Sequence, residues 1–149
     1  MYITAAYTPA KFNKRKTDNG DKKMKKCFLT EKGPRAIGPY STATVYGGVC
    51  YLSGMLGVDP AIGKLAEGGV EAQARQAMRN IITVLEEMKL SAGAVLKTTV
   101  FLADLNDFSK VNAIYADFFG PDYPARSCVQ VARLPMDALV EIEAIVAAE

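Results

Sequence analysis

The feature that most constrains the fold is a long amphipathic segment over residues 69–89. Its apolar residues recur every three or four positions, so an α-helix gathers them on one side. These residues are Val70, Ala74, Ala77, Met78, Ile81, Ile82, Leu85 and Met88. A helix with one apolar face has to bury that face against another layer of secondary structure. The segment therefore predicts a helix that packs on a sheet, provided that the rest of the chain supplies strands.

The apolar runs on either side of this segment are short and typical of strands. Two of them, 43–46 and 49–53, are separated by Gly47-Gly48, a pair that readily supplies the positive φ of a tight hairpin turn. The five expected strands are 43–46, 49–53, 96–102, 125–131 and 140–146. A short apolar piece at 27–29 raises the number to six if it pairs as well.

A second helix is expected between the strands 96–102 and 125–131. Asn106 or Asp107 is a suitable N-terminal cap, and Gly120-Pro121 stops the helix. Its apolar stripe consists of Phe108, Val111, Tyr115, Phe118 and Phe119. The order of elements predicts an α+β fold, with one sheet and both helices packed on one of its faces.

The other face of that sheet is left without a cover. In the strand 125–131, period-two alternation places Arg126, Cys128 and Gln130 on one face, and Val129 and Val131 on the other. A sheet face of mixed apolar and functional residues suits packing against other subunits.

Length and charge suggest one domain with an extension. The 149 residues are enough for one domain with a core and too few for two. We expect a flexible extension over 1–23 and the domain over 24–149. Removing the extension's six basic and two acidic residues from totals of 18 and 16 leaves 12 basic and 14 acidic. The slightly acidic domain argues against a nucleic-acid surface. No apolar run reaches the roughly 20 residues of a membrane-spanning helix.

Cysteine and histidine usage narrows the chemistry. Cys27, Cys50 and Cys128 are odd in number and have no CxxC spacing, which fits a reducing, cytoplasmic compartment. The chain has no histidine. Its absence excludes His-dependent triads, HExxH zinc sites and imidazole bases, so proton transfer falls to a carboxylate, thiol, tyrosine, lysine or bound water.

Arg126 is one candidate for substrate binding. It lies at the start of an expected strand, where the sheet would hold its backbone rigidly, and its planar fork matches the two oxygens of a carboxylate. An edge-strand arginine that only solvates the rim of the sheet is the commoner outcome.

Two carboxylates are candidates for general base work. Glu141 and Glu143 are two residues apart on one face of an otherwise apolar strand. Carboxylates in such a strand either face solvent or have a raised pKa that suits a general base.

Three further positions are open to more than one interpretation. Cys128 is either a nucleophile, for which only Arg126 could supply the positive field, or an inert buried thiol. Ser53-Gly54 ends an expected strand, where a hydroxyl and a free backbone N–H could hold an anion, although turn chemistry explains the pair equally well. Tyr40 is a loop aromatic that either covers a small pocket or packs.

Several motifs together resemble the RidA/YjgF family, and the resemblance spans about residues 25–147. The most specific of them is the run from Pro124 to Val129, which continues as Val131-Ala132-Arg133-Leu134-Pro135 and ends at Val140 to Ile145. The other motifs are Ala36-Ile37-Gly38-Pro39-Tyr40-Ser41, Leu52-Ser53-Gly54, Gln73-Ala74-Arg75-Gln76, 97–102 and 104–108.

The resemblance implies a chorismate-mutase-like fold, in which a six-stranded sheet carries two helices on one face. Three subunits close a central barrel, and the active sites lie in the clefts between them. It also implies hydrolysis of 2-aminoacrylate-type enamines and their 2-imino acid tautomers, 2-iminopropanoate and 2-iminobutanoate, to 2-keto acids and ammonia. Pyridoxal-phosphate-dependent dehydratases make these substrates, and the family uses no cofactor or metal.

The resemblance also implies a role for individual residues. Arg126 would hold the substrate carboxylate, and Glu141 would orient or deprotonate the attacking water. Cys128 and Ser53-Gly54 would line the pocket, largely through backbone groups, with Tyr40 and Asn112 near the imine end. Met55 departs from the glutamine of many members, and the loop 120–123 is short.

Two other functions fit the same motifs. RNA binding or cleavage with translation inhibition is attributed to some family members, but the acidic domain offers no basic and aromatic platform for it. A non-catalytic homotrimer that binds small carboxylates or acts as a holdase would bind ligand without turnover.

Overall fold

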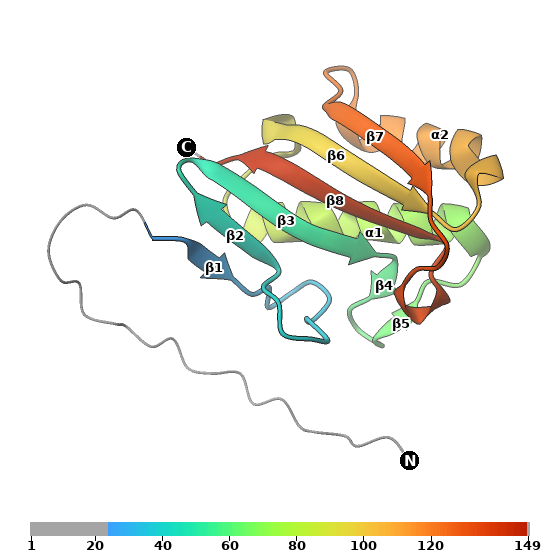
Figure 1. The fold of residues 1–149 in the computed structure, drawn as a ribbon, viewed down its shortest axis with the longest axis horizontal. Coiled ribbons are helices and arrows are strands. Elements are labelled where there is room, and N and C mark those ends of the chain that lie inside the picture. The colour runs from blue at the N-terminus through green and yellow to red at the C-terminus, as the bar shows by residue number, and fades with distance from the viewer. Residues whose placement is uncertain (1–23, 149) are drawn as a thin grey trace, which may run out of the picture.

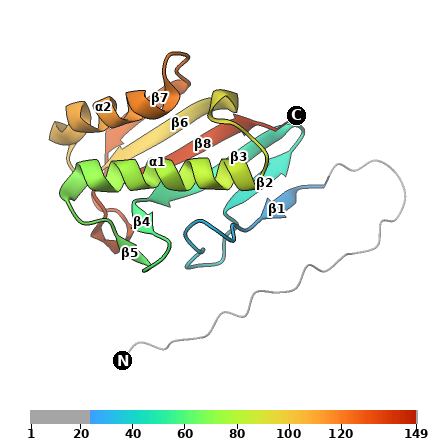
Figure 2. The same cartoon turned by 180° about the vertical axis from the view of Figure 1, so that it is seen from behind.

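A computed structural model describes residues 24–148, which form a six-stranded sheet and two α-helices (Figure 1). Both helices lie on the same face of the sheet, as the turned view makes plain (Figure 2). The α+β fold class expected from the sequence is therefore confirmed. The flexible extension expected over residues 1–23 lies outside the described residues.

The sheet mixes antiparallel and parallel pairing. Its strands in spatial order are β1 (Lys26–Phe28), β2 (Ala43–Tyr46), β3 (Val49–Leu56), β8 (Val140–Ala147), β6 (Val95–Leu102) and β7 (Ala125–Gln130). All neighbours are antiparallel except β6 and β7, which are parallel. The parallel pair requires a crossover, which α2 (Phe108–Phe119) provides. Strand β7 consequently ends up at one edge of the sheet.

Two turns lie on either side of strand β3 in the first half of the chain. Gly47 and Gly48 both have positive φ, 59° and 78°, as expected for the tight turn between β2 and β3. The turn-rich loop after β3 contains a short hairpin of β4 (Val58–Asp59) and β5 (Lys64–Leu65) that the sequence pattern did not indicate. Two residues per strand are too few for period-two alternation to be visible.

The long helix α1 (Gly69–Glu87) packs along the middle of the sheet. Its apolar stripe is buried in the core, with Ala74, Ala77 and Met78 fully inaccessible. The helix ends two residues before the amphipathic pattern does, because Lys89 adopts a left-handed φ of 60°. No helix among residues 24–148 has the length and apolarity needed to cross a bilayer.

The start of α2 differs in detail from the expected cap. Asp107 occupies the N-cap position, but its carboxylate accepts no cap hydrogen bond and instead pairs with Lys110 at 2.8 Å. The Asp104 carboxylate caps the preceding short turn by accepting from the Asn106 N–H at 2.9 Å. Asp104, Asn106 and Asp107 all have side chains that can cap a helix. The local sequence does not show which of them accepts the capping hydrogen bond.

The two faces of the sheet have different environments. The face under the helices is buried and includes Leu52, Val100 and Ile142. The opposite face has no helix on it, and Tyr46, Tyr51 and Val129 remain 54%, 50% and 46% exposed there. This exposed face agrees with the expectation from the sequence.

Candidate active site

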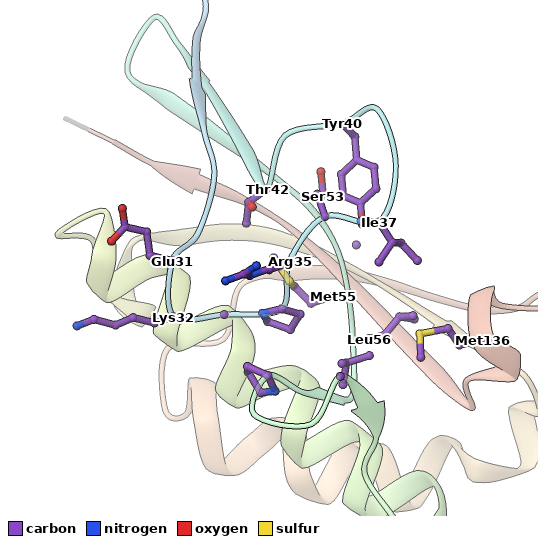
Figure 3. Close-up of a pocket in the computed structure, with 17 residues that line it drawn as sticks. Glu31, Lys32, Arg35, Ile37, Tyr40, Thr42, Ser53, Met55, Leu56 and Met136 are labelled. Atoms are coloured by element: carbon purple, nitrogen blue, oxygen red, sulfur yellow. The ribbon is translucent and has the colours of Figure 1, made fainter. Parts of the chain in front are cut away.

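A cavity of about 360 Å³ lies between the loop 31–40 and the far end of β3 (Figure 3). Tyr40, Ser53 and Gly54 are among the residues that line it. Tyr40 is 48% exposed, and its hydroxyl accepts a hydrogen bond from the Ile37 N–H at 3.3 Å. Tyr40 was expected either to cover a small pocket or to pack in the protein. Its position at the cavity favours the first of these roles.

Ser53 and Gly54 lie inside β3, and not at its end as the sequence suggested. The strand continues to Leu56, with a bulge between Leu52 and Met55 where its register against β8 shifts. The Ser53 N–H donates to the Thr42 carbonyl at 3.0 Å, and its hydroxyl donates to the Ser41 carbonyl at 2.7 Å. Ser53 therefore uses both donors within the protein, so the expected free N–H is not at this residue.

Glu141 lies directly against the bulge. A Cβ built on Gly54 would lie only 1.8 Å from Glu141 Oε1 and 2.8 Å from its Cδ. With the Glu141 side chain in this position, a larger residue at position 54 would have to displace the carboxylate. Tyr40, Ser53, Gly54 and Glu141 are called the carboxylate half of the candidate site below.

The protonation equilibrium of Glu141 is shifted towards the acid. Partial burial raises the pKa of its carboxyl group, and the nearby Glu143 carboxylate raises it further. The two glutamates share the face of the sheet that the helices leave open, but Glu143 is exposed and Glu141 is half-buried. The sequence left open whether these carboxylates face solvent or have a raised pKa. In the structure Glu143 faces solvent, and Glu141 is the one whose pKa is raised. A raised pKa gives a carboxylate more basic strength near neutral pH.

Arg126 lies at the other edge of the sheet, in a cleft of about 380 Å³ that Asn112 also lines. The guanidinium carbon is 4.6 Å from the centre of the Tyr115 ring and 5.5 Å from that of Phe108. Such contacts with ring faces attract the cation and restrict its side chain. The ion pairs among residues 24–148 are Arg75–Asp117, Lys110–Asp107 and Arg133–Asp137. The positive charge of Arg126 is in none of them.

Two residues on helix α2 hold Arg126 in place, and the sequence pattern did not assign them this role. Tyr115 and Phe108 are seven positions apart and so share a face of the helix. The Tyr115 hydroxyl is hydrogen-bonded to the buried Thr98 hydroxyl at 2.7 Å, which fixes the ring under the guanidinium. In the sequence, only the seven-residue spacing of Phe108 and Tyr115 pointed to a shared role. Packing of both rings in the core would explain that spacing equally well.

Cys128 follows Arg126 by two residues on the same strand face. Burial raises the pKa of the Cys128 thiol, and the charge of Arg126 opposes that shift only in part. The neutral thiol is therefore favoured over the nucleophilic thiolate. Of the two roles considered for Cys128, this environment favours the inert one. Arg126, Asn112 and Cys128 are called the arginine half of the candidate site.

The two halves do not meet within one chain. Glu141 on β8 pairs with Phe101 on β6, and Phe101 pairs with Val129 on β7. Two interstrand spacings, about 10 Å in total, and three positions along β7 therefore separate Glu141 from Arg126. Arg126 also points to the face that the helices cover, whereas Glu141 alternates with the buried Val140 and Ile142 and points to the open face. One small molecule cannot contact both side chains of the same chain.

The loop that carries Tyr40 is anchored to the end of helix α1. The Glu87 carboxylate accepts hydrogen bonds from the backbone N–H groups of Glu31 and Lys32, at 3.0 and 3.2 Å. The Thr30 hydroxyl also donates to this carboxylate and accepts from the Gly33 N–H at 2.8 Å. Burial disfavours the charge of Glu87, but these hydrogen bonds outweigh it and lower its pKa. Glu87 is thus a positioning residue for the wall of the cavity.

We expect Glu87→Ala to lower the free energy of unfolding at neutral pH by about 1–2 kcal/mol, because it removes a charged acceptor from three donors. A depressed pKa in the folded state contributes stability above the unfolded value of about 4.3, and that contribution is lost as the pH falls through the folded value. The difference between wild type and variant should therefore shrink below about pH 4. Urea unfolding over a pH series measures it.

Glu86→Ala is the matched control, because Glu86 is the exposed neighbour on the same helix and makes none of these hydrogen bonds. It changes helix propensity by the same amount. If the two variants lose the same free energy of unfolding, the hydrogen bonds of Glu87 to the loop contribute nothing beyond helix propensity.

Comparison with known proteins places this arrangement in a family. Residues 30–148 match the family described as Endoribonuclease L-PSP. A 2-iminobutanoate/2-iminopropanoate deaminase of Salmonella typhimurium is 50% identical over 125 residues, which cover 82% of this chain and 97% of the relative. A RutC family protein of Pyrococcus horikoshii is 45% identical over 122 residues, with 82% and 97% covered.

A solved structure agrees with these sequence matches. The crystal structure of Escherichia coli TdcF with bound serine superposes with a TM-score of 0.78 at 42% identity, covering 83% of this chain and 99% of that one. The likeness extends over the sheet and both helices. Because the family match spans residues 30–148 and relatives reach 50% identity, this chain belongs to the RidA/YjgF family, described as Endoribonuclease L-PSP.

Proposed function

We propose that the protein hydrolyses short 2-imino acids and their enamine tautomers to 2-keto acids and ammonia. The observation that carries this proposal is the charge of Arg126, which has no carboxylate partner among residues 24–148 and is held by two aromatic rings. A cation kept in place without a partner is suited to a ligand carboxylate. The relatives named 2-iminobutanoate/2-iminopropanoate deaminase support the choice of reaction.

The chemistry follows from the roles of Arg126 and Glu141. Arg126 binds the substrate carboxylate through its fork and leaves the C=N carbon beside the carboxylate half of the site. Water adds to the carbon of the protonated imine while Glu141 accepts the proton that the water loses. Glu141 returns this proton to the carbinolamine nitrogen. As the C–N bond breaks, the Glu141 carboxylate accepts the hydroxyl proton, so that the keto acid and ammonia form, and the ammonia then takes up this proton as ammonium. An enamine is first protonated at carbon. The protonated imine is already electrophilic, so positioning and one base suffice and no cofactor is required.

We further propose that the complete site forms between subunits of a homotrimer. The arginine half of one subunit would face the carboxylate half of its neighbour, since within one chain they lie on opposite faces of the sheet. The exposed tyrosines Tyr46 and Tyr51 support this assembly, because apolar area on an open sheet face is stabilised when another subunit covers it. The imines would come from pyridoxal-phosphate-dependent dehydratases in the cytoplasm.

A coupled assay tests the proposed reaction. Threonine dehydratase and threonine generate 2-aminocrotonate and 2-iminobutanoate, and release of 2-ketobutyrate is followed with and without the purified protein. We expect the protein to accelerate keto acid release well above the dehydratase alone. Unchanged release at equimolar protein would rule the activity out. Light scattering of the same sample determines whether the active species is a trimer.

A further inference from the structure

We propose that the cavity next to Glu141 receives the substrate side chain and makes this enzyme prefer imino acids with larger apolar side chains over 2-iminopropanoate. The inference rests on the proposed function and adds a substrate class to it. Gly54 connects the two regions, since it touches the Glu141 carboxylate and also lines the cavity. A substrate whose reacting carbon lies beside Glu141 therefore has this cavity within reach of its side chain.

The cavity is larger than a methyl group requires. Its volume is about 360 Å³, within the range of small-molecule pockets, which begins near 300 Å³. The methyl group of 2-iminopropanoate would leave most of this space to water. A side chain of four or more heavy atoms would displace that water from apolar walls, and the burial of each additional methylene favours binding.

Several apolar side chains that are exposed to solvent gather at this cavity. Ile37, Tyr40 and Met136 line it, although they are 76%, 48% and 46% exposed. Met55, which is 5% exposed, contributes to the wall on the side of the core. Figure 3 shows Ile37 and Met136 around the same opening as Tyr40, whereas Lys32 points away from them. The exposed apolar area is stabilised when a ligand covers it.

The backbone presents Met136 at an energetic cost. Met136 and the next residue, Asp137, have φ of 59° and 56°, a left-handed conformation that is unfavourable for residues other than glycine. The Asp137 carboxylate is held by Arg133, at 2.6 and 3.1 Å. This pair stabilises a loop that places an apolar side chain over the cavity. Strain of this kind concentrates at functional sites.

The competing occupant is an acidic side chain, because Arg35 also lines the cavity. Arg35 is exposed and belongs to none of the ion pairs among the described residues. The charge of an exposed arginine is screened by solvent, whereas Ile37, Met55 and Met136 contribute apolar side chains to the lining. The balance of the lining therefore favours an apolar side chain.

The test compares imines made in place by the matching amino acid oxidase from alanine, leucine, methionine and aspartate, with semicarbazide trapping the unhydrolysed imine. We expect kcat/KM for the imines from leucine and methionine to exceed that for the alanine imine by about tenfold or more, since one methylene in an apolar pocket already changes kcat/KM by that order. A preference for the alanine or aspartate imine overturns the inference.

Two isoleucines make a matched pair of variants. Ile37→Gln removes apolar character at the cavity, whereas Ile62→Gln does so in the β4–β5 turn, where the side chain is 64% exposed and outside the lining. Ile37→Gln should reduce the preference for the leucine imine to about threefold or less, and Ile62→Gln should keep it. Equal effects of the two variants would overturn the assignment of the cavity.

A second substitution keeps the inference testable if Ile37→Gln fails to assemble. Met136→Gln is nearly isosteric and should reduce the preference in the same way, while Met136→Leu should retain it. Hydrolysis of all imines at similar rates contradicts the side-chain selectivity but leaves the proposed function standing. Hydrolysis of none contradicts both.

Discussion

Arg126→Ala is expected to lower kcat/KM for 2-iminobutanoate by about 10²-fold or more. Loss of one partner from a buried, hydrogen-bonded charge pair costs about 2–5 kcal/mol, and 1.36 kcal/mol corresponds to a factor of ten. The substrate carboxylate would then lack its fork, and the C=N carbon would no longer be held beside the base. The coupled dehydratase assay, with the amount of protein increased to detect residual activity, measures the loss.

Two controls separate substrate binding from folding. Arg126→Lys keeps the charge but loses the planar fork and the stacking on Tyr115, so it should recover only part of the lost activity. Arg75→Ala removes a surface arginine that pairs with Asp117 at 3.5 Å, and it should retain full activity. Wild-type kinetics of Arg126→Ala in a correctly assembled sample would refute the carboxylate clamp.

Glu141→Gln is expected to reduce kcat by about 10²-fold or more while stabilising the folded protein at neutral pH. The activity falls because an amide cannot accept the proton of the attacking water. The stability rises because burial and Glu143 raise the pKa of Glu141, which means that folding disfavours its charged form. For a carboxyl group whose folded pKa is raised, this cost is present above the folded pKa and is absent below the unfolded value.

Thermal unfolding at pH 7 and at pH 3.5, together with a pH–rate profile, tests both parts. The variant should have the higher Tm at pH 7 and a Tm close to that of the wild type at pH 3.5. In the wild type, activity should rise with pH through the raised pKa of Glu141, above its usual value of about 4.3. A wild-type rate for Glu141→Gln would show that another group is the base.

Glu143→Gln is the matched variant for this prediction. Glu143 lies on the same strand and face but is exposed, so its loss should leave most of the activity. Removing its charge removes one cause of the raised pKa of Glu141. The acid limb of the pH–rate profile should therefore move to lower pH. A profile that does not move would show that burial alone sets the pKa.

The order of elements could be predicted from the sequence because each element has a local signal. The apolar period of residues 69–89 made α1 recognisable, and Gly47-Gly48 marked the hairpin between β2 and β3. These signals report which residues face a core, since burial on one side repeats with the geometry of the helix or strand. They also explain the small errors at the ends of elements. Where α1 stops depends on the left-handed φ of Lys89, which no period reports.

The residues of the candidate site were proposed as a set only through their motifs. Arg126, Glu141 and Tyr40 are not distinguished by periodicity from a rim arginine, a solvent-facing carboxylate and a packed aromatic. Their assignment to a site comes from the resemblance to a family, and their roles remain predictions. Composition contributed the absence of histidine, which limits the base to a few residue types and is compatible with a glutamate in that role.

By itself, the sequence determined the elements, their order and the kinds of side chain available for chemistry, because these depend on neighbours along the chain. The tertiary structure alone decided how those side chains are placed. It put Glu141 against the Gly54 bulge, joined Glu87 to Thr30 across 57 positions, and set Arg126 and Glu141 on opposite faces of the sheet. Register and packing fix such pairs, and they arise from the sum of contacts across the whole core and not from any local pattern.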